Sequence, residues 1–267
     1  MTRLALAVAL LLPLASLAEE AAPPAPKPVE WKGTAGAGLI VLTGNSEATT
    51  FTGTATASRE TFGWILSSKL AGAYGQSRPA GDGASQVSAF SAAGQVRLAR
   101  KFGATWSVFV LGGVEADHVA SVEYRTAAEV GVGAQWLDVK RDDWQRLALR
   151  TDLGLRYGYE ARYQYYGDPP VAPATRVQPG VETLAPKVGV AFRYGFSKEV
   201  FFTEEAEAFP SLTGESRLQA KSVSKLSSRL TRAVTMGVSY TVVFDSAPAA
   251  GKVKTDTALT ALLEVGF

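Results

Sequence analysis

Polar and apolar side chains alternate one by one along most of this chain after residue 30. The final stretch, residues 255–267, shows the pattern in its simplest form. Leu263 and Val265 fall on one side of an extended backbone, and Glu264 falls on the other. A period of two indicates a β-strand with one apolar and one polar face. The open edge of such a strand needs a partner, and pairing with the first strand of a closed barrel provides one.

Segments with this alternation recur between turn-forming residues along the chain. We predict strands over residues 31–43, 50–57, 62–74, 85–100, 105–117, 122–137, 145–159, 182–196, 200–209, 215–230, 233–245 and 255–267. Short alternating segments of this kind are typical of transmembrane barrels. The predicted fold is therefore all-β: a closed, antiparallel, up-and-down transmembrane β-barrel of about 12 strands.

The lengths of the predicted connections provide an independent check on the strand count. The long connections, residues 75–84, 161–181 and 246–254, all follow odd-numbered strands. The connections after even-numbered strands are short. Transmembrane barrels have short periplasmic turns and longer outer loops, so this sorting predicts a periplasmic N-terminus.

A soluble sandwich or lipocalin-like barrel also produces alternation, because one face of its sheet packs on a core. In this chain the face opposite the apolar one carries many large charges, which favours a charged interior and a lipid-facing exterior. Aromatic residues near the predicted strand ends match the girdles of membrane barrels. They are Trp31, Trp64, Trp106, Trp136, Trp144, Tyr157, Tyr159, Tyr194 and Phe267.

The N-terminus has the pattern of an export signal. Arg3 precedes an apolar run, residues 4–17, and Ser16-Leu17-Ala18 forms a small-x-small cleavage site with cutting expected after Ala18. An anchor helix is the alternative, but the run is short for a bilayer and no basic flank follows it. We predict a cleaved signal peptide over residues 1–18, a proline-rich periplasmic linker over 19–30 and the barrel over 31–267.

Composition narrows the class of protein further. The 46% hydrophobic residues are dispersed, and after the N-terminus no run approaches the ~20 apolar residues of a membrane helix. The net charge of +2 arises from scattered basic and acidic residues, which argues against a nucleic-acid partner. The chain has no cysteine, which suits an oxidising periplasm.

Three stretches resemble the YdiY-like family of salt-induced outer-membrane proteins, a family known as a domain of unknown function. They are Trp31-Lys32-Gly33 leading to residues 42–47, the strand of residues 155–160, and residues 243–257 continued to Phe267. The resemblance implies a porin-like barrel in the outer membrane of a Gram-negative bacterium, in contact with outer-membrane lipids. It also implies insertion by the barrel assembly machinery, which reads the C-terminal strand ending in Phe267. The family supplies no established activity and no catalytic residues.

Candidate catalytic chemistry is sparse in this chain. His118, its single histidine, follows Asp117, a pair that could serve in a hydrolase, although no serine is identifiably placed beside it. An exposed loop histidine is the alternative. One histidine without cysteine leaves no zinc constellation. We therefore predict no catalytic residue, no cofactor and no metal site.

The densest acidic group is Glu204, Glu205 and Glu207. Glu205 and Glu207 share one strand face, where two carboxylates could perform acid-base chemistry or bind a cation. The alternative is that they neutralise arginines inside the barrel. We expect ion pairs across the sixth to tenth strands, because leaving such charges unpaired is costly.

Charged residues on the polar faces are the candidate functional residues. The predicted lumen-lining set is Arg125, Glu129, Arg146, Arg150, Asp152, Arg156, Lys187, Arg193, Glu205, Glu207, Arg217, Lys221 and Lys225. A barrel of about 12 strands is wider than one filled by side chains and narrower than an open porin. The first functional hypothesis is a narrow channel for small solutes or ions, with a mild anion preference from the slight basic excess. The alternatives are a plugged structural or stress-response envelope barrel and an outer-membrane hydrolase.

Overall fold

A computed structural model describes residues 31–42, 47–78, 84–166, 176–213 and 216–267. The predicted signal peptide and linker, residues 1–18 and 19–30, lie outside the described residues. None of the described residues belongs to a helix long and apolar enough to cross a membrane.

Twelve antiparallel strands form one closed barrel, in which each strand pairs with its sequence neighbours and the last pairs with the first. They are β1 (Trp31–Leu42), β2 (Glu47–Thr61), β3 (Trp64–Arg78), β4 (Gln86–Phe102), β5 (Trp106–Asp117), β6 (Val122–Arg141), β7 (Trp144–Tyr163), β8 (Val177–Gly195), β9 (Val200–Pro210), β10 (Leu218–Arg229), β11 (Val234–Asp245) and β12 (Thr255–Gly266). The predicted strand number, pairing and closure are confirmed.

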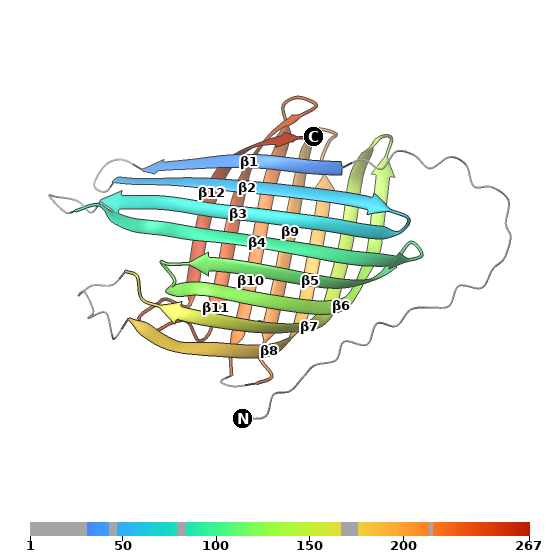
Figure 1. The fold of residues 1–267 in the computed structure, drawn as a ribbon. Helices are drawn as coiled ribbons and strands as arrows, with labels where there is room; N and C mark the ends of the chain where they lie inside the picture. The colour runs from blue at the N-terminus through green and yellow to red at the C-terminus, as the bar shows by residue number, and fades with distance from the viewer. Residues whose placement is uncertain (1–30, 43–46, 79–83, 167–175, 214–215) are drawn as a thin grey trace.

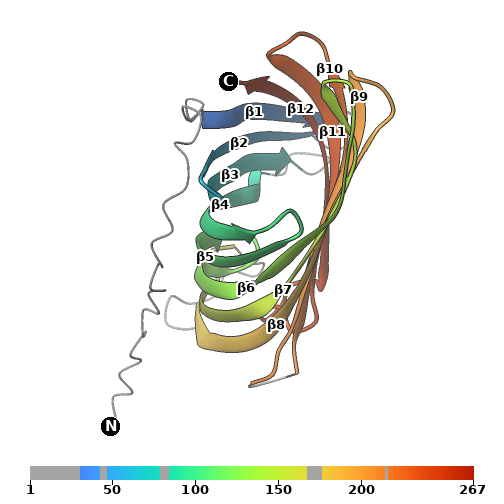
Figure 2. The same ribbon diagram turned by 90° about the vertical axis from the view of Figure 1, so that its right-hand side faces the viewer.

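The two walls of the barrel are clearly seen in the ribbon views. Strands β1 to β8 form the near wall of Figure 1, and they cross the β9 to β12 strands behind them. Figure 2 shows the same two walls from the side. Closing a sheet requires its strands to tilt against the barrel axis, so strands on opposite walls must cross.

The main difference from the predicted bounds lies in β7 and β8. We expected an outer connection over residues 161–181, but backbone pairing continues to Tyr163 opposite Val177. The register shifts between Glu160 and Arg162, across from Pro179 and Gly180. Proline cannot donate to a strand ladder and is tolerated at a bulge, which is why this segment has the sequence pattern of a loop.

Several connections after even-numbered strands are tight turns. Phe62 and Gly63 join β2 to β3 with φ of 46° and 78°. Asp142, with φ of 55°, and Asp143 join β6 to β7. Positive φ at these positions gives the backbone twist that suits a two-residue hairpin.

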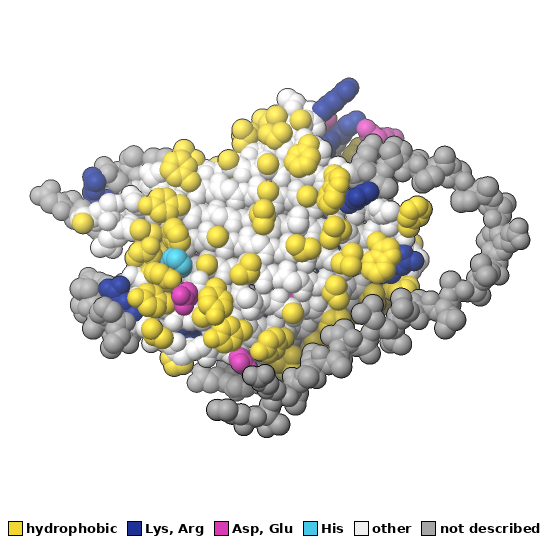
Figure 3. Space-filling model, in the orientation of Figure 1, with side chains coloured by type: hydrophobic (Ala, Val, Ile, Leu, Met, Phe, Trp, Pro, Cys, Tyr) yellow, Lys and Arg dark blue, Asp and Glu magenta, His cyan; other side chains and the backbone are white. Residues whose placement is uncertain are grey.

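Burial in this barrel is opposite to that of a soluble protein. Large apolar side chains such as Val110 and Leu153 are 53% and 54% exposed. Charged Glu129, Glu160 and Lys187 are only 6%, 3% and 6% exposed. Figure 3 shows that charged side chains are rare in the middle of the near face and lie mostly toward its ends. The outer wall is therefore apolar and the interior is polar.

One predicted girdle residue, Trp144, lies elsewhere. Its ring packs against Gly195 of β8, where an added β-carbon would lie 3.0 Å from the Trp144 Cε3. Gly195 is in phase with Lys187 on the interior face of β8, so the Trp144 ring lies inside the barrel.

Candidate functional site: the interior of the barrel

A chain of ion pairs crosses strands β6 to β9 in the interior. Lys187 Nζ lies 2.6 Å from Glu129 Oε2 and 3.2 Å from Glu207 Oε2. Arg156 Nη1 lies 3.5 Å from the other oxygen of Glu129. These four side chains come from four consecutive strands. Their charges alternate along the contacts Arg156–Glu129–Lys187–Glu207, so each charge has an opposite partner.

Asp152 of β7 is the centre of a second cluster. It accepts two hydrogen bonds from Arg97, of 2.6 and 3.1 Å, and one of 3.0 Å from Arg150 Nε. Arg97 belongs to β4, which is not a neighbour of β7 in the sheet. The Arg97–Asp152 pair therefore crosses the interior, and its bidentate geometry fixes both side chains.

A third cluster surrounds Glu160 near the end of β7. Its carboxylate lies 2.5 Å from Arg162 Nε, 2.6 Å from Arg125 Nη2 and 3.0 Å from Arg217 Nη2. Arg217 also pairs with Asp245 of β11. These contacts join β6, β7 and β11 to Arg217, the residue immediately before β10, at one end of the barrel.

Two further lysines in the interior, Lys69 on β3 and Lys225 on β10, also form ion pairs. Lys69 Nζ lies 3.1 Å from Glu205 Oε2, and Lys225 Nζ lies 2.9 Å from both carboxylate oxygens of Glu264. Strands β3 and β9 are half-way round the ring from each other. The Lys69–Glu205 pair therefore joins opposite walls, and both side chains are well exposed, at 45% and 62%.

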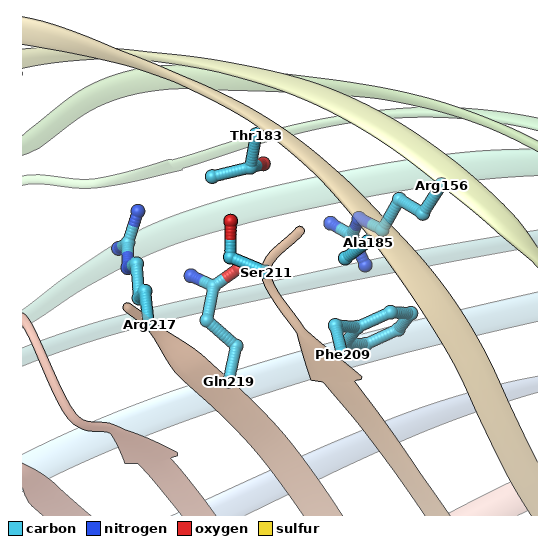
Figure 4. Close-up of a pocket in the computed structure, with 7 residues that line it drawn as sticks. All are labelled: Arg156, Thr183, Ala185, Phe209, Ser211, Arg217 and Gln219. Atoms are coloured by element: carbon cyan, nitrogen blue, oxygen red, sulfur yellow. The ribbon is translucent and has the colours of Figure 1, made fainter. Parts of the chain in front are cut away.

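A small pocket lies between the first and third of these clusters (Figure 4). It is lined by Arg156, Thr183, Ala185, Phe209, Ser211, Arg217 and Gln219, which leave almost no room for a water molecule between them. The Arg156 guanidinium lies 4.3 Å above the Phe209 ring. Because Arg156 is paired with Glu129, and Arg217 with Glu160, the charges that line this pocket are already neutralised.

Three residues of the predicted interior set have no carboxylate within ion-pair distance in the described part of the chain: Arg146, Arg193 and Lys221. Arg146 and Lys221 are exposed. Arg193 lies with its guanidinium carbon 3.8 Å above the Phe201 ring. The remaining ten residues of the set all take part in the ion pairs described above.

Interior aromatic rings are the feature that the sequence analysis missed. Phe109 and Phe209 are 2% and 5% exposed, and the Arg97 guanidinium lies 3.9 Å above the Phe109 ring. The alternation of side chains along the strand could have located these rings. Phe209 shares the face of Glu205 and Glu207, so alternation alone places it inside the barrel.

The structure does not bring the candidate catalytic residues, Glu204 and the Asp117–His118 pair, into one site. Glu204 points to the outer face of β9, where it accepts a 2.6 Å hydrogen bond from Ser222 Oγ. His118 is stacked between Phe90 and Tyr165, with ring centroids 4.6 and 3.7 Å away. Asp117 accepts a hydrogen bond from the backbone N–H of Ala120. Within the described ranges, no group of three potential metal ligands occurs.

Comparison with family models gives a match to the family described as "Protein of unknown function, DUF481" over residues 35–267. The match confirms the family resemblance found in the sequence. Comparison with curated proteins gives no match.

Solved structures with a similar fold are barrels. The translocator domain of autotransporter NalP from Neisseria meningitidis is 12% identical, with a TM-score of 0.43, over 89% of this chain and 86% of that one. The NanC porin is also 12% identical, with a TM-score of 0.43, over 87% of this chain and 97% of that one. The KdgM porin, solved with disordered oligogalacturonate, is 12% identical with a TM-score of 0.36, over 88% and 96%.

Proposed function

The chain belongs to the DUF481 family of proteins of unknown function, and from this premise we propose that it is a bacterial outer-membrane barrel enclosing a narrow, water-filled channel for small solutes or ions. The proposal rests on the closed barrel, its apolar outer wall and its charged interior. The Lys69–Glu205 pair is the observation that carries the channel itself.

The outer wall supports the membrane location. In a closed barrel the backbone N–H and C=O groups of every strand are hydrogen-bonded to a neighbouring strand, which is the condition for a sheet to cross a bilayer. The exposed apolar side chains on its outer face would contact outer-membrane lipids. In this proposal the barrel assembly machinery inserts the chain by recognising the C-terminal strand and Phe267.

Water access in the middle of the barrel supports a channel. Lys69 and Glu205 meet from opposite walls, yet they remain 45% and 62% exposed. Gln95, which lies opposite Lys69 in the β3–β4 register, is exposed as well. Because this register places Gln95 on the same interior face as Lys69, solvent reaches the barrel interior beside the bridge.

The β1 and β2 strands supply a wall of small polar side chains beside this bridge. Thr34 and Thr56 face each other on the interior face, with their hydroxyl oxygens 2.8 Å apart. Gly36 and Gly38 continue that face along β1. Small side chains on one wall leave room for water, while the charged clusters extend over β4 and over β6 to β11. The slight excess of basic groups favours anions.

Planar-bilayer recording of the refolded barrel tests the channel. We expect small single-channel steps from the native protein and larger steps from the Lys69→Ala/Glu205→Ala double variant, because the bridge no longer crosses the bore. Exchange of Lys101 and Glu60 for alanine removes an equally exposed pair at the strand ends and serves as the control. Correctly folded native protein that passes no current would rule the channel out.

A plugged structural barrel is the second candidate, and the interior ion pairs between non-neighbouring strands favour it. Arg97–Asp152 and Arg217–Glu160 hold distant strands together through the interior. Such a barrel would have a structural role in the envelope, with induction under osmotic stress as the family resemblance implies. In the same recording, a plugged barrel would pass no current, either before or after removal of the Lys69–Glu205 pair.

A further inference from the structure

Arg193, a half-buried arginine, differs from the other arginines of the interior because it has no carboxylate partner in the described part of the chain. Its position on β8 is in phase with Lys187, so its side chain enters the barrel. Its guanidinium carbon lies 3.8 Å above the centroid of the Phe201 ring. The ring covers one face of the guanidinium plane and fixes its orientation, while the N–H groups around the edge of that plane stay free for a ligand.

Hydrogen-bond donors around this ring lack acceptors in the described part of the chain. Arg193 Nε is buried without a hydrogen-bond partner. The hydroxyl of Ser227, a residue only 1% exposed, is also unpartnered, and Ser227 lies directly opposite Phe201 in the β9–β10 register. A buried donor without an acceptor is costly, so two beside one aromatic ring indicate that an acceptor is missing.

Arg193 has no carboxylate within ion-pair distance in the described part of the chain. Arg229 lies on the same interior face of β10 as Ser227, and its charge acts on Arg193 and also on the Asp143 carboxylate in the β6–β7 turn. Lys225 and Arg150 are the next cations along the interior, and each is already paired with its own carboxylate, Glu264 and Asp152. Arg193 therefore has no opposite charge of its own among the described residues at the end of the barrel where β8 meets β9.

Small side chains leave space for a ligand at this position. The residues directly opposite Arg193 are Ala148 on β7 and Thr203 on β9. Ala191 precedes it on the interior face of β8. The register neighbours of Arg193 on both adjacent strands are therefore short side chains.

We propose that Arg193, held on Phe201 and flanked by Arg229 and Ser227, forms a binding site for a small oxyanion, a carboxylate or a phosphate. Both groups present paired oxygens that match the planar guanidinium donors, and the Ser227 hydroxyl supplies a further donor. If anions pass through the barrel, this site would bind them on their way, and that role rests on the proposed channel. The binding of an anion at Arg193 does not depend on the channel.

Binding is measured on the folded barrel in detergent at low ionic strength, from line broadening of the ³¹P signal of inorganic phosphate and the ¹³C signal of acetate. We expect Arg193→Gln to weaken binding by about tenfold or more, because a charge-assisted hydrogen bond is lost. Arg193→Lys keeps the charge without the planar donors and should weaken it less. Arg229→Gln tests the second cation and should also weaken binding.

Arg59→Gln is the matched control, since it removes the same charge outside the wall, where Arg59 lies 5.7 Å above the Trp31 ring. Undiminished phosphate and acetate binding by Arg193→Gln would overturn the site, as would no saturable binding by the native barrel. Binding of only one of the two anions supports the site and identifies the ligand class. If the barrel binds phosphate through Arg193 but never conducts, the binding site stands and the channel is overturned. If the barrel conducts but does not bind the anions, the channel stands and the binding site is overturned.

Discussion

The ring of Phe267, the last residue, lies over Gly33, where an added β-carbon would fall 2.7 Å from the Phe267 Cε2. The two residues also exchange backbone hydrogen bonds of 2.9 and 3.0 Å. This contact stands at the seam where β12 meets β1, the pairing that closes the barrel. Fewer residues are aligned along this seam than between any other two neighbouring strands in the described part of the chain, so each contact in it matters for closure.

Gly33→Val should weaken closure by about 1–3 kcal/mol, the usual cost of overpacking. The new side chain meets the Phe267 ring and the carbonyl oxygen of Thr56, which is backbone and cannot turn aside. Urea unfolding of the barrel in lipid vesicles gives the free energy. Gly53→Val, on the adjacent strand, is the control and should be neutral or better, because a β-carbon added there meets nothing within 4 Å. Equal losses in the two variants would contradict the role of the seam.

Asp152→Asn should cost about 3 kcal/mol, because it leaves Arg97 and Arg150 without their shared carboxylate in a mostly buried cluster. Glu60→Gln breaks the exposed pair with Lys101 and should cost less than about 1 kcal/mol. Both values come from urea unfolding under the same conditions. A larger loss for Glu60→Gln would show that the interior cluster is not where the barrel gains its electrostatic stability.

Much of this architecture is readable from the sequence, because strand phase is a local property. The alternation in β7 separates Arg150 and Asp152 from Leu153, and that single pattern predicts the interior and exterior of the strand. Register across the barrel is not local. The meeting of Lys69 with Glu205 depends on the tilt and flattening of the whole barrel, which no single segment encodes. The Pro179 bulge also escaped prediction, since proline usually ends a strand.

The Asp143–Lys198 pair predicts a simple dependence on pH. It joins two connections at the strand ends, with Lys198 Nζ 2.8 Å from Asp143 Oδ2. The hydrogen bond from Lys198 lowers the pKa of the Asp143 carboxyl below its usual value, and the same bond raises the pKa of Lys198. A lowered carboxyl pKa stabilises the fold above the unfolded pKa of about 3.9, and the benefit is lost as pH falls through the folded value.

For Lys198 the sign is opposite: its contribution is present below about pH 10 and is lost as pH rises through the folded pKa. The pair should therefore add no pH dependence to unfolding between these limits. Titration of the Asp143 carboxyl carbon by NMR checks the direction of the shift, with Lys198→Gln returning the pKa toward its ordinary value. An Asp143 pKa at or above its ordinary value in the native protein would contradict the contact.

Glu204 offers a test of what covers the outer wall. Its carboxylate accepts hydrogen bonds from Ser222 and Ser224 on the outer face of the β9–β10 pair. A carboxylate that faces lipid is destabilising, although less so than a basic group at the same depth. Glu204→Leu should therefore stabilise the barrel in vesicles by about 1 kcal/mol. Ala206→Leu enlarges the same face without removing a charge, so it should stabilise less. If Glu204→Leu instead weakens the barrel relative to Ala206→Leu, this stretch of wall packs on protein and the lipid-facing assignment fails there.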